Sequence, residues 1–581
     1  MQNKKKNIKR NNIIQLILGI VIIILLNVIG AYLFTRVDLT SEKRYSLSDA
    51  TREMLGEVDD IVFFRVYLEG DFPAGFQRLR NATKEMLDEF RAYNDNIHYE
   101  FINPSESENQ KERNETYQLL VESGLNPTDL QVKTNEGMSQ KIIFPGALVT
   151  YRSKEIPLEL LRTQVGVPPE QVLNNSIQAL EFNLANSIQK LSRPMKASIA
   201  FITGHGELSA ERTADLMNTL ALDYNVERVP IKGQINSLAE RTAVDSLTTR
   251  IRNKYDAIII AKPDSAFTDR DKFIIDQYIM RGGNVLWFID PVFASMDSIQ
   301  NQESTVGVAM DMNLQDLFFR YGVRLNRNLV MDLNAMPIPV VVGQMGDQPQ
   351  YEFFPWYYFP LLNPTSDHPI VKNLNAIKTQ FVSSIDTIKK PGIKKTVLLK
   401  TSPYSRTVRT PAFISLRMIQ EEPNERQYGG PAQNVAMLLE GSFESLFRNR
   451  MPPEIAEDKD IGFLESGEPA KMLVVSDGDI IKNQMRQGFP LPLGYDQYTQ
   501  RTFGNKEFIL NALSYMIDES NLISVRGKEI KLRMLDKTRV NNNKILVQLL
   551  NTVVPVLIIL IFWIIQYFLR KRKYTRSWTK K

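Results

Sequence analysis

The sequence predicts an α/β protein that is anchored in a membrane near both ends of the chain. Three observations lead to this fold class. The chain has 581 residues, more than one hydrophobic core normally organises, which indicates several domains. Two long apolar runs lie near the two ends. Between them, continuous apolar strands alternate with amphipathic helices, which is typical of a parallel sheet covered on both faces.

The first apolar run extends from Ile13 to Phe34, with Gln15 and Asn27 as its strongly polar residues. At 1.5 Å per residue, a helix over this run spans roughly 33 Å, enough to cross the bilayer core. A cleaved signal peptide is the alternative, but its apolar region is about 7 to 15 residues long and ends at a small-residue cleavage site. We therefore predict a transmembrane helix over 13–34.

The second apolar run extends from Ile545 to Leu569 and includes Pro555, which a membrane helix tolerates because neighbouring groups satisfy the freed carbonyl. The Lys and Arg residues predict the orientation. They are concentrated in residues 1–12, and the second helix has equal numbers on its two sides, so the first helix decides. We expect both termini in the cytoplasm and residues 36–544 on the far side of the membrane.

The basic residues of the two tails explain the formal net charge of +5 and the pI of 8.9. Residues 1–12 and 570–581 contain no acid, so removing their Lys and Arg leaves the rest of the chain acidic. Such tails are attracted to anionic lipid. No aromatic and basic motif accompanies them, so we expect no nucleic-acid binding.

The chain contains no cysteine. This excludes disulfides, thiolate nucleophiles, iron–sulfur clusters and cysteine-based zinc sites together. Many classes of enzyme are excluded by this single observation.

A small α/β domain follows the first apolar run. Its pattern is the strand "DIVFFRVYLEG", a helix from Phe76 to Tyr93 with apolar residues at helical spacing, and the strand "IHYEFINP". This β-α-β unit predicts a thioredoxin-like arrangement. Because no CxxC is present, thioredoxin-type redox chemistry is excluded.

A parallel-sheet domain begins at "KASIAFITGHGE" and continues through "YDAIIIAKPDSAFTDRDKFIIDQYIMRGGNVLWFIDP", which predicts strand, helix, Gly-Gly turn and strand. The predicted organisation is a basic tail over 1–12, a transmembrane helix over 13–34, an N-terminal α/β domain over 36–190, the parallel-sheet domain over 195–525 with an insertion at about 291–390, a basic linker over 526–544, a transmembrane helix over 545–569 and a basic tail over 570–581.

The insertion contains the aromatic segment "EFFPWYYFPLLNPTSDHPI". Soluble monomers seldom expose such a cluster. It is therefore either the core of an inserted subdomain or a contact surface for a partner, and we favour the core.

The first candidate site is Gly204, His205, Gly206 and Glu207, directly after a strand. The H-x-E spacing is half of a zinc-deaminase signature, but the other half requires cysteines. Gly204 and Gly206 can take positive φ without steric cost, which favours a structural turn. Exposed amides at the next helix could hold an anion or a partner's carboxylate. We predict a turn with a possible recognition role, no catalysis and no metal.

The second candidate site is "SDGD", with Ser476, Asp477 and Asp479 after another strand. Two carboxylates at such a position can bind a divalent cation, but they more often form an Asx-type turn. We group these three residues with the first loop as candidate binding residues at the edge of the sheet.

Six pieces follow one another along the chain: "RVDLTSEKRYSLSDAT", "ITGHGE", "DHPI", "VVSDGD", "GNKEFILNALSYM" and a terminal membrane helix. Their order resembles the GldG family of gliding-motility proteins and its relatives, the auxiliary proteins of uncharacterised ABC transport systems. The resemblance implies a cytoplasmic-membrane protein with its bulk in the periplasm. It also implies a sheet domain similar to that of intraflagellar transport proteins, related to the flavodoxin and amidotransferase folds.

The resemblance implies partners as well: an ABC permease and ATPase of the GldF and GldA kind, the bilayer, and proteins of the motility machinery. No Walker A pattern is present, so ATP hydrolysis must lie in another subunit. We predict a non-enzymatic, substrate-binding-type accessory subunit without a cofactor. The alternatives are a structural scaffold of a motility or secretion machine, and an envelope hydrolase acting through His205, Glu207 and Asp477.

Overall fold

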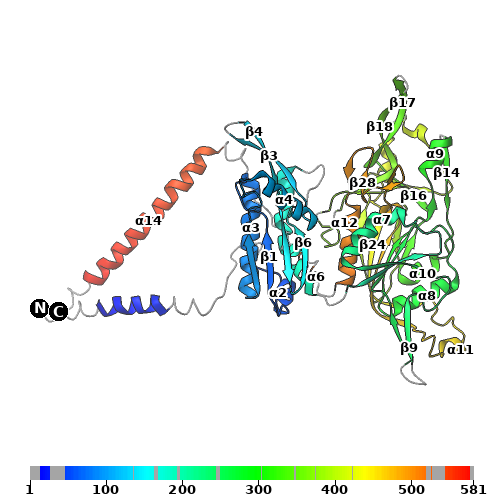
Figure 1. The fold of residues 1–581 in the computed structure, drawn as a ribbon, viewed down its shortest axis with the longest axis horizontal. Coiled ribbons are helices and arrows are strands. Elements are labelled where there is room, and N and C mark those ends of the chain that lie inside the picture. Colours follow the sequence, from blue (N-terminus) through cyan, green and yellow to red (C-terminus); the bar gives the residue numbers. More distant parts are fainter. Residues whose placement is uncertain are drawn as a thin grey trace. The chain divides into compact units, whose positions relative to one another are not determined.

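A computed structural model gives the fold of the chain (Figure 1). It describes residues 13–25, 46–134, 137–161, 168–192, 196–243, 249–302, 304–345, 348–364, 366–372, 374–419, 421, 423–518, 522, 525 and 543–575. The predicted basic tail over 1–12 and nearly all of the basic linker over 526–544 lie outside these residues. The prediction of an α/β protein is confirmed.

The N-terminal domain contains a four-stranded sheet in the order β2-β1-β5-β6. The predicted β-α-β unit is present: β1 and β2 are parallel and α3 connects them, while β5 and β6 are antiparallel additions. Its elements are α2 (Asp49–Gly56), β1 (Val62–Val66), α3 (Ala74–Tyr93), β2 (Ile97–Phe101), α4 (Gln110–Glu122), β3 (Thr128–Thr134), β4 (Gly137–Ile143), β5 (Gly146–Tyr151), β6 (Lys154–Glu159), α5 (Pro169–Gln178) and α6 (Leu180–Ser192).

A seven-stranded sheet in the order β21-β24-β25-β12-β11-β7-β8 organises the second domain. The strands β25, β12, β11, β7 and β8 are parallel, as predicted, whereas β24 is antiparallel to both of its neighbours. The elements are β7 (Ser198–Thr203), η1 (Glu211–Thr213), α7 (Ala214–Asp223), β8 (Asn225–Pro230), β9 (Ala239–Ala243), β10 (Thr249–Asn253), β11 (Ala257–Ala261), α8 (Asp269–Met280), β12 (Asn284–Phe288), β21 (Ile393–Lys400), β24 (Asn434–Glu444), α11 (Pro453–Ala456), β25 (Ser466–Val475), η4 (Gly478–Ile481) and α12 (Asn505–Ile517).

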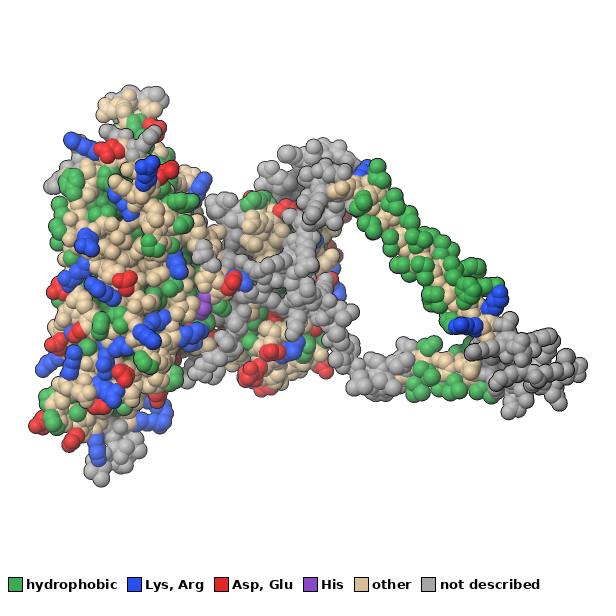
Figure 2. All heavy atoms as spheres, turned by 180° about the vertical axis from the view of Figure 1, so that it is seen from behind, with side chains coloured by type: hydrophobic (Ala, Val, Ile, Leu, Met, Phe, Trp, Pro, Cys, Tyr) green, Lys and Arg blue, Asp and Glu red, His purple; other side chains and the backbone are tan. Residues whose placement is uncertain are grey.

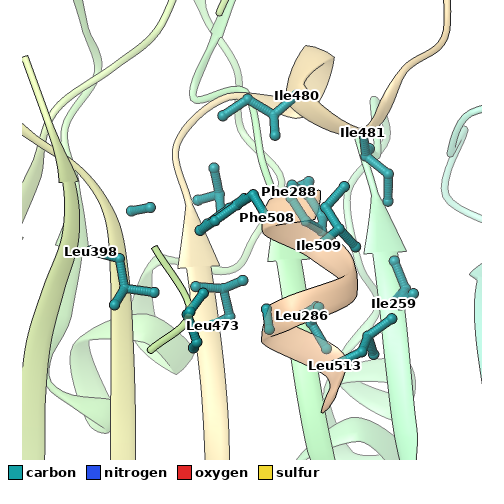
Figure 3. Close-up of a cluster of buried hydrophobic side chains, with 14 of the residues drawn as sticks. Ile259, Leu286, Phe288, Leu398, Leu473, Ile480, Ile481, Phe508, Ile509 and Leu513 are labelled. Atoms are coloured by element: carbon teal, nitrogen blue, oxygen red, sulfur yellow. The ribbon is translucent and has the colours of Figure 1, made fainter. Parts of the chain in front are cut away.

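Both faces of this sheet are buried, because alternate residues of each strand enter two different cores. In β11, Ile259 belongs to the core under α7 and α12, and Ile258 and Ile260 belong to the core under α8 and α10 (Gln315–Tyr321). Figure 3 shows Phe508, Ile509 and Leu513 of α12 facing the strands. Burial on both faces explains why these strands read as continuous apolar runs.

An inserted subdomain has its own core, built around Trp356, Tyr358 and Phe381. Two strands from beyond the predicted insertion, β22 and β23, pair with its strands β16 and β14. The elements of this region are β13 (Val292–Phe293), α9 (Met296–Gln302), β14 (Ser304–Ala309), α10, β15 (Val323–Leu325), β16 (Asn328–Asp332), β17 (Ala335–Met345), β18 (Gln348–Leu362), β19 (Ile377–Lys378), β20 (Ile385–Thr387), β22 (Ser405–Arg409), β23 (Ala412–Ser415), η2 (Leu416–Ile419) and η3 (Glu425–Tyr428).

Short hairpins β26 (Met485–Arg486) with β27 (Phe489–Pro490), and β28 (Tyr495–Asp496) with β29 (Arg501–Thr502), precede α12.

The helix α14 (Lys544–Thr575) belongs to a separate unit of the chain. Its stretch Lys544–Arg572 is 29 residues long, contains an 18-residue window with a mean hydropathy of 2.6 and is, among the described residues, the one helix long and apolar enough to cross a membrane. Apolar side chains cover its surface (Figure 2). A shorter apolar helix extends over Ile13–Leu25, and the rest of the first predicted span lies outside the described residues. Both helices are consistent with membrane anchoring.

Candidate functional site at the carboxyl edge of the central sheet

The seven candidate residues lie in two loops at the carboxyl ends of β7 and β25. Strands β11 and β12 separate these loops in the sheet. In the described part of the chain, no hydrogen bond or ion pair joins Gly204–Glu207 to Ser476–Asp479. The first loop instead bonds to the segment after β11 and to α8, and the second loop bonds to residues after β11 and β12, so there are two neighbouring clusters rather than one combined site.

The first loop is a tight turn, as predicted. Gly204 and Gly206 have φ values of +124° and +73°, which favour glycine. A Cβ atom at Gly206 would lie 1.6 Å from Oδ1 of Asp264. The carbonyl of His205 accepts hydrogen bonds from the backbone N–H groups of Asp264 and Ser265, at 2.9 and 3.0 Å. The turn is thus tied to the loop that follows β11.

The side chain of His205 is buried, with 4% of its surface exposed, and both of its ring nitrogens have partners. Its ring stacks on Phe267, with centroids 3.7 Å apart and planes 13° apart. Nδ1 lies 3.2 Å from Oε1 of Glu207, and Nε2 lies 3.1 Å from Oδ2 of Asp271. Both ring nitrogens therefore face carboxylates, which favours the doubly protonated imidazolium.

These contacts shift the pKa values of His205 and Asp271 in opposite directions. Burial by itself lowers the pKa of His205, but the hydrogen bonds and charges of Glu207 and Asp271 outweigh it and raise that pKa above 6.5. Burial by itself raises the pKa of Asp271. The hydrogen bonds from Thr268, Gly233 and His205 outweigh that effect and lower it below 3.8.

Asp271 reaches His205 because it lies in the first turn of α8. Thr268 caps this helix, accepting from the backbone N–H of Asp271 at 3.2 Å. Its hydroxyl also donates to Oδ2 of Asp271 at 2.6 Å, and the N–H of Gly233 donates to Oδ1 at 2.7 Å. The carboxylate is therefore held by the cap, by the loop after β8 and by His205, which leaves the imidazole in a fixed position.

The second loop forms the predicted Asx-type turn. Oδ1 of Asp477 accepts from the N–H of Asp479 at 2.7 Å, and Oδ2 accepts from the N–H of Gln380 at 2.8 Å. The hydroxyl of Ser476 donates to the carbonyls of Ser383 and Val435. These contacts join β25 to neighbouring segments and hold Ser476 and Asp477 as buried structural residues.

Asp479 meets two residues that the sequence reasoning missed, Lys262 after β11 and Asp290 after β12. Nζ of Lys262 lies 2.9 Å from Oδ2 of Asp290 and also forms an ion pair with Asp479. Lys482 pairs with the other oxygen of Asp479 at 2.9 Å. The chain thus supplies its own cations to this acidic cluster.

Carboxylate oxygens of Asp290, Asp477 and Asp479 lie within 4.8 Å of one another, a spacing that could suit a divalent cation. The ammonium of Lys262 already contacts two of the three. Despite burial, Asp290 and Asp479 raise the pKa of Lys262, so the ammonium stays charged. Burial and the two neighbouring carboxylates raise the pKa of Asp477. This arrangement favours an internal ion-pair network over a metal site.

The pKa of Asp479 is lowered, whereas that of Asp477 is raised. Burial opposes ionisation of this carboxyl, but the charges of Lys262 and Lys482 outweigh it and lower the pKa below 3.8. The cluster therefore contains one carboxylate held ionised by two ammonium groups, and beside it a carboxyl, Asp477, whose ionisation is opposed.

The sequence contains a pattern from which Lys262 and Asp290 could have been predicted. Lys262 directly follows the run "AIIIA", and Asp290 directly follows "VLWFI". A charged residue at the carboxyl end of a buried parallel strand is expected to meet the residues at the ends of neighbouring strands.

The position of the first loop is notable because it is a switch point of the sheet. The chain passes from β7 through α7 to β8, and then returns to β11 on the other side of β7. Open α/β sheets commonly bind ligands at such a point. Here the loops after β7 and β11 close over it, with the N–H of Leu208 donating to the carbonyl of Ala261 at 3.0 Å.

These features define a class of protein: a two-domain α/β protein with a long apolar C-terminal helix and a sheet edge closed by its own side chains. The chain belongs to the family described as an ABC-type uncharacterized transport system, of the auxiliary kind, which matches residues 196–512. Residues 41–150 match a domain of unknown function, DUF7088. The family assignment makes the chain an accessory component of an ABC transport system.

Two individual similarities accompany the family match. An uncharacterized protein from Borreliella burgdorferi is 20% identical over 575 residues, covering 97% of this chain and 99% of the relative. A solved structure of the mmIFT52 N-terminal domain is 12% identical and covers 55% of this chain and 97% of that one, with a TM-score of 0.31.

Proposed function

We propose that this protein is a membrane-anchored, non-enzymatic accessory subunit of an ABC transport complex that serves gliding motility, with a substrate-binding type of role. The observation that carries the proposal is the family match over the sheet domain in a chain that ends in the apolar helix α14. The GldG-like order of sequence pieces supports the assignment to motility. The ABC permease and ATPase partners would be of the GldF and GldA kind.

The proposed topology has two membrane passes in the inner membrane. Both termini lie in the cytoplasm, and residues 36–544 lie in the periplasm. The apolar helices over Ile13–Leu25 and Lys544–Arg572 support this arrangement, and the basic residues of 1–12 support the orientation. We further infer a thioredoxin-like N-terminal domain, because its sheet order places two antiparallel strands beside a parallel β-α-β unit.

The absence of catalysis is part of the proposal. A general base needs an accessible lone pair, and a general acid needs a proton that can reach the substrate. The two ring nitrogens of His205 are engaged by Glu207 and Asp271, and Asp477 accepts two backbone hydrogen bonds. The backbone at Gly204 and Gly206 is exposed, so any recognition by this loop would use main-chain groups.

Copurification of the full-length chain in mild detergent tests the transport role. We expect a permease and an ATPase subunit to be recovered with it. Recovery of motility or secretion components without any ABC subunit would support the scaffold alternative instead. Replacing Lys544–Thr575 by an unrelated transmembrane helix would show whether this segment contacts the permease.

The hydrolase alternative is tested with His205→Ala. Cellular function, normalised to the amount of folded protein, should be unchanged if the residue is structural. A complete loss of function per folded molecule would instead support chemistry at His205, Glu207 and Asp477.

A further inference from the structure

The hairpin formed by β17 and β18 has a buried base and an exposed outer half. Trp356 and Tyr358 at the base are 1% and 2% exposed. Farther out, Val341, Tyr351 and Phe353 are 55%, 56% and 47% exposed. Val341 lies opposite Tyr351, and Pro339 lies opposite Phe353, so these four residues share one face. We call them the arm face; Figure 1 shows the hairpin projecting from its subdomain.

The arm is suited to contact through side chains rather than through its strand edges. Pro337 and Pro339 in β17, and Pro349 and Pro355 in β18, lack the N–H group that an added strand would need. The sequence from Ala335 to Leu362 contains no Lys or Arg, and Glu352, which lies opposite Val340, has its side chain on the other face of the ribbon. The arm face itself is thus apolar.

A second exposed apolar surface lies on the three-stranded sheet β13-β14-β23. Phe293, Val306, Val308 and Phe413 are 57%, 46%, 52% and 68% exposed. Phe293 lies opposite Val308, and Val306 lies opposite Phe413. We call these four residues the sheet face. The alternate residues of the same strands enter the core of the subdomain, so the sheet is apolar on both sides.

A cavity of about 410 Å³ continues the sheet face. Its lining includes Pro291 and Met310, each two residues from a sheet-face residue and therefore on the same side of the ribbon. Phe319, Arg324 and Arg327 line it as well. An apolar surface beside a cavity with arginines at its border has the composition of a protein interface.

We propose that the chain forms a twofold dimer in which the arm face of each copy covers the sheet face of the other. Both surfaces are exposed within one copy, so neither covers the other there. A reciprocal exchange is closed by twofold symmetry and leaves no surface free for further assembly.

The size of the contact is adequate. An aromatic side chain buries about 150–250 Å² when fully covered, so four half-exposed aromatic residues at each of two contacts would bury roughly 600–1,000 Å² of apolar surface. Specific interfaces bury about 1,200–2,000 Å² in total, of which somewhat more than half is apolar.

Cross-linking between copies tests the proposal, because the chain has no cysteine of its own. Full-length Phe353→Cys with one affinity tag is co-expressed with full-length Val308→Cys, or Phe413→Cys, carrying another tag. Mild oxidation of the membranes should give a disulfide-linked product that contains both tags. The control partner is Leu222→Cys on α7, a residue 74% exposed but outside the sheet face.

A yield no higher than that of the Leu222→Cys control would overturn the proposal. So would capture of a different protein by Phe353→Cys, which would assign the arm to that partner. All four positions are exposed, so the variants should fold, and unchanged thermal unfolding checks this.

Substitution beside the cross-linked position gives a second, independent measurement. In the Phe353→Cys chain, Tyr351→Ser should lower the cross-linking yield severalfold because it removes apolar area from the arm face, whereas Glu352→Ser, on the opposite face of the ribbon, should leave the yield unchanged. Equal yields in the two double variants would contradict the proposed contact.

Discussion

The carboxyl edge of the central sheet and the inserted subdomain differ in one respect: charged side chains at the edge are paired within the chain, whereas apolar side chains of the subdomain are exposed. At the sheet edge, His205, Lys262 and Asp479 are all paired within the chain. In the subdomain, Phe353 and Phe413 expose about half of their surface or more to solvent. The ionisable side chains at the sheet edge are therefore bonded within the chain, whereas the insertion exposes apolar side chains to solvent.

This difference separates side chains that stabilise the fold from side chains that are exposed to solvent. Buried ionised groups need partners, and loops at the ends of parallel strands supply them at short range. Variants at the two regions should therefore affect different properties, and the following predictions test that separation.

Lys262→Met should have the largest effect on stability among the variants at the sheet edge. It removes the ammonium that contacts Asp290 and Asp479 and leaves three neighbouring carboxyl groups, so we expect a loss of about 3–5 kcal/mol. Thermal or denaturant unfolding of the detergent-solubilised chain measures it. Lys482→Met, which removes only the outer partner of Asp479, is the matched control with a smaller loss. If Ca²⁺ or Mg²⁺ raised the unfolding midpoint of the wild type, the ion-pair interpretation would be wrong.

His205→Gln should cost about 3 kcal/mol near pH 6, because two buried carboxylates lose their cation. The pKa of His205 is raised in the folded state, so its contribution is fully present below about pH 6.5. That contribution is lost as the pH rises through the folded-state pKa. The pKa of Asp271 is lowered, so its contribution is present above pH 3.8 and is lost in acid.

The difference in stability between the wild type and His205→Gln should therefore shrink with rising pH, by up to about 1.4 kcal/mol per pH unit. Unfolding curves at a series of pH values measure it. Taking the difference also cancels the contribution of His368, whose pKa is lowered by burial. A difference independent of pH would mean that His205 is not charged in the folded protein.

Gly206→Ala should cost roughly 2–3 kcal/mol, since the new Cβ collides with Asp264 and the backbone has positive φ. Gly204→Ala is the matched control: it also has positive φ, but no heavy atom lies within 4 Å of its Cβ position. Equal losses for the two variants would show that backbone strain, and not the contact with Asp264, accounts for the effect.

Phe353→Ser should have the smallest effect on stability, within about 0.5 kcal/mol, because this side chain is half exposed. Trp356→Ala, three residues along the same strand, should cost about 3–5 kcal/mol because it empties part of a buried core. Unfolding of both variants, together with their self-association, sharpens the comparison between stability and recognition. A large stability loss in Phe353→Ser would mean that the arm face belongs to the core.

Much of the fold was predictable from local patterns. The continuous apolar run "AIIIA" of β11 and the 3.6-residue spacing of apolar residues in α3 are local properties of the sequence. The turn at Gly204 and Gly206 and the Asx-type turn at Asp477 were predictable for the same reason. The partners of these turns were not, because Asp271 lies 66 residues from His205 and Lys262 lies 217 residues from Asp479.

The aromatic segment shows the same division between local and tertiary information. Composition alone marked residues 350–370 as either a core or a contact surface. The pairing of β17 with β18 and the packing of Trp356 and Tyr358 assign the base to the core and leave Tyr351 and Phe353 exposed. The sequence by itself determined where apolar and charged groups occur along the chain. Only the tertiary structure decided which of them are buried together, because burial depends on contacts between segments far apart in sequence.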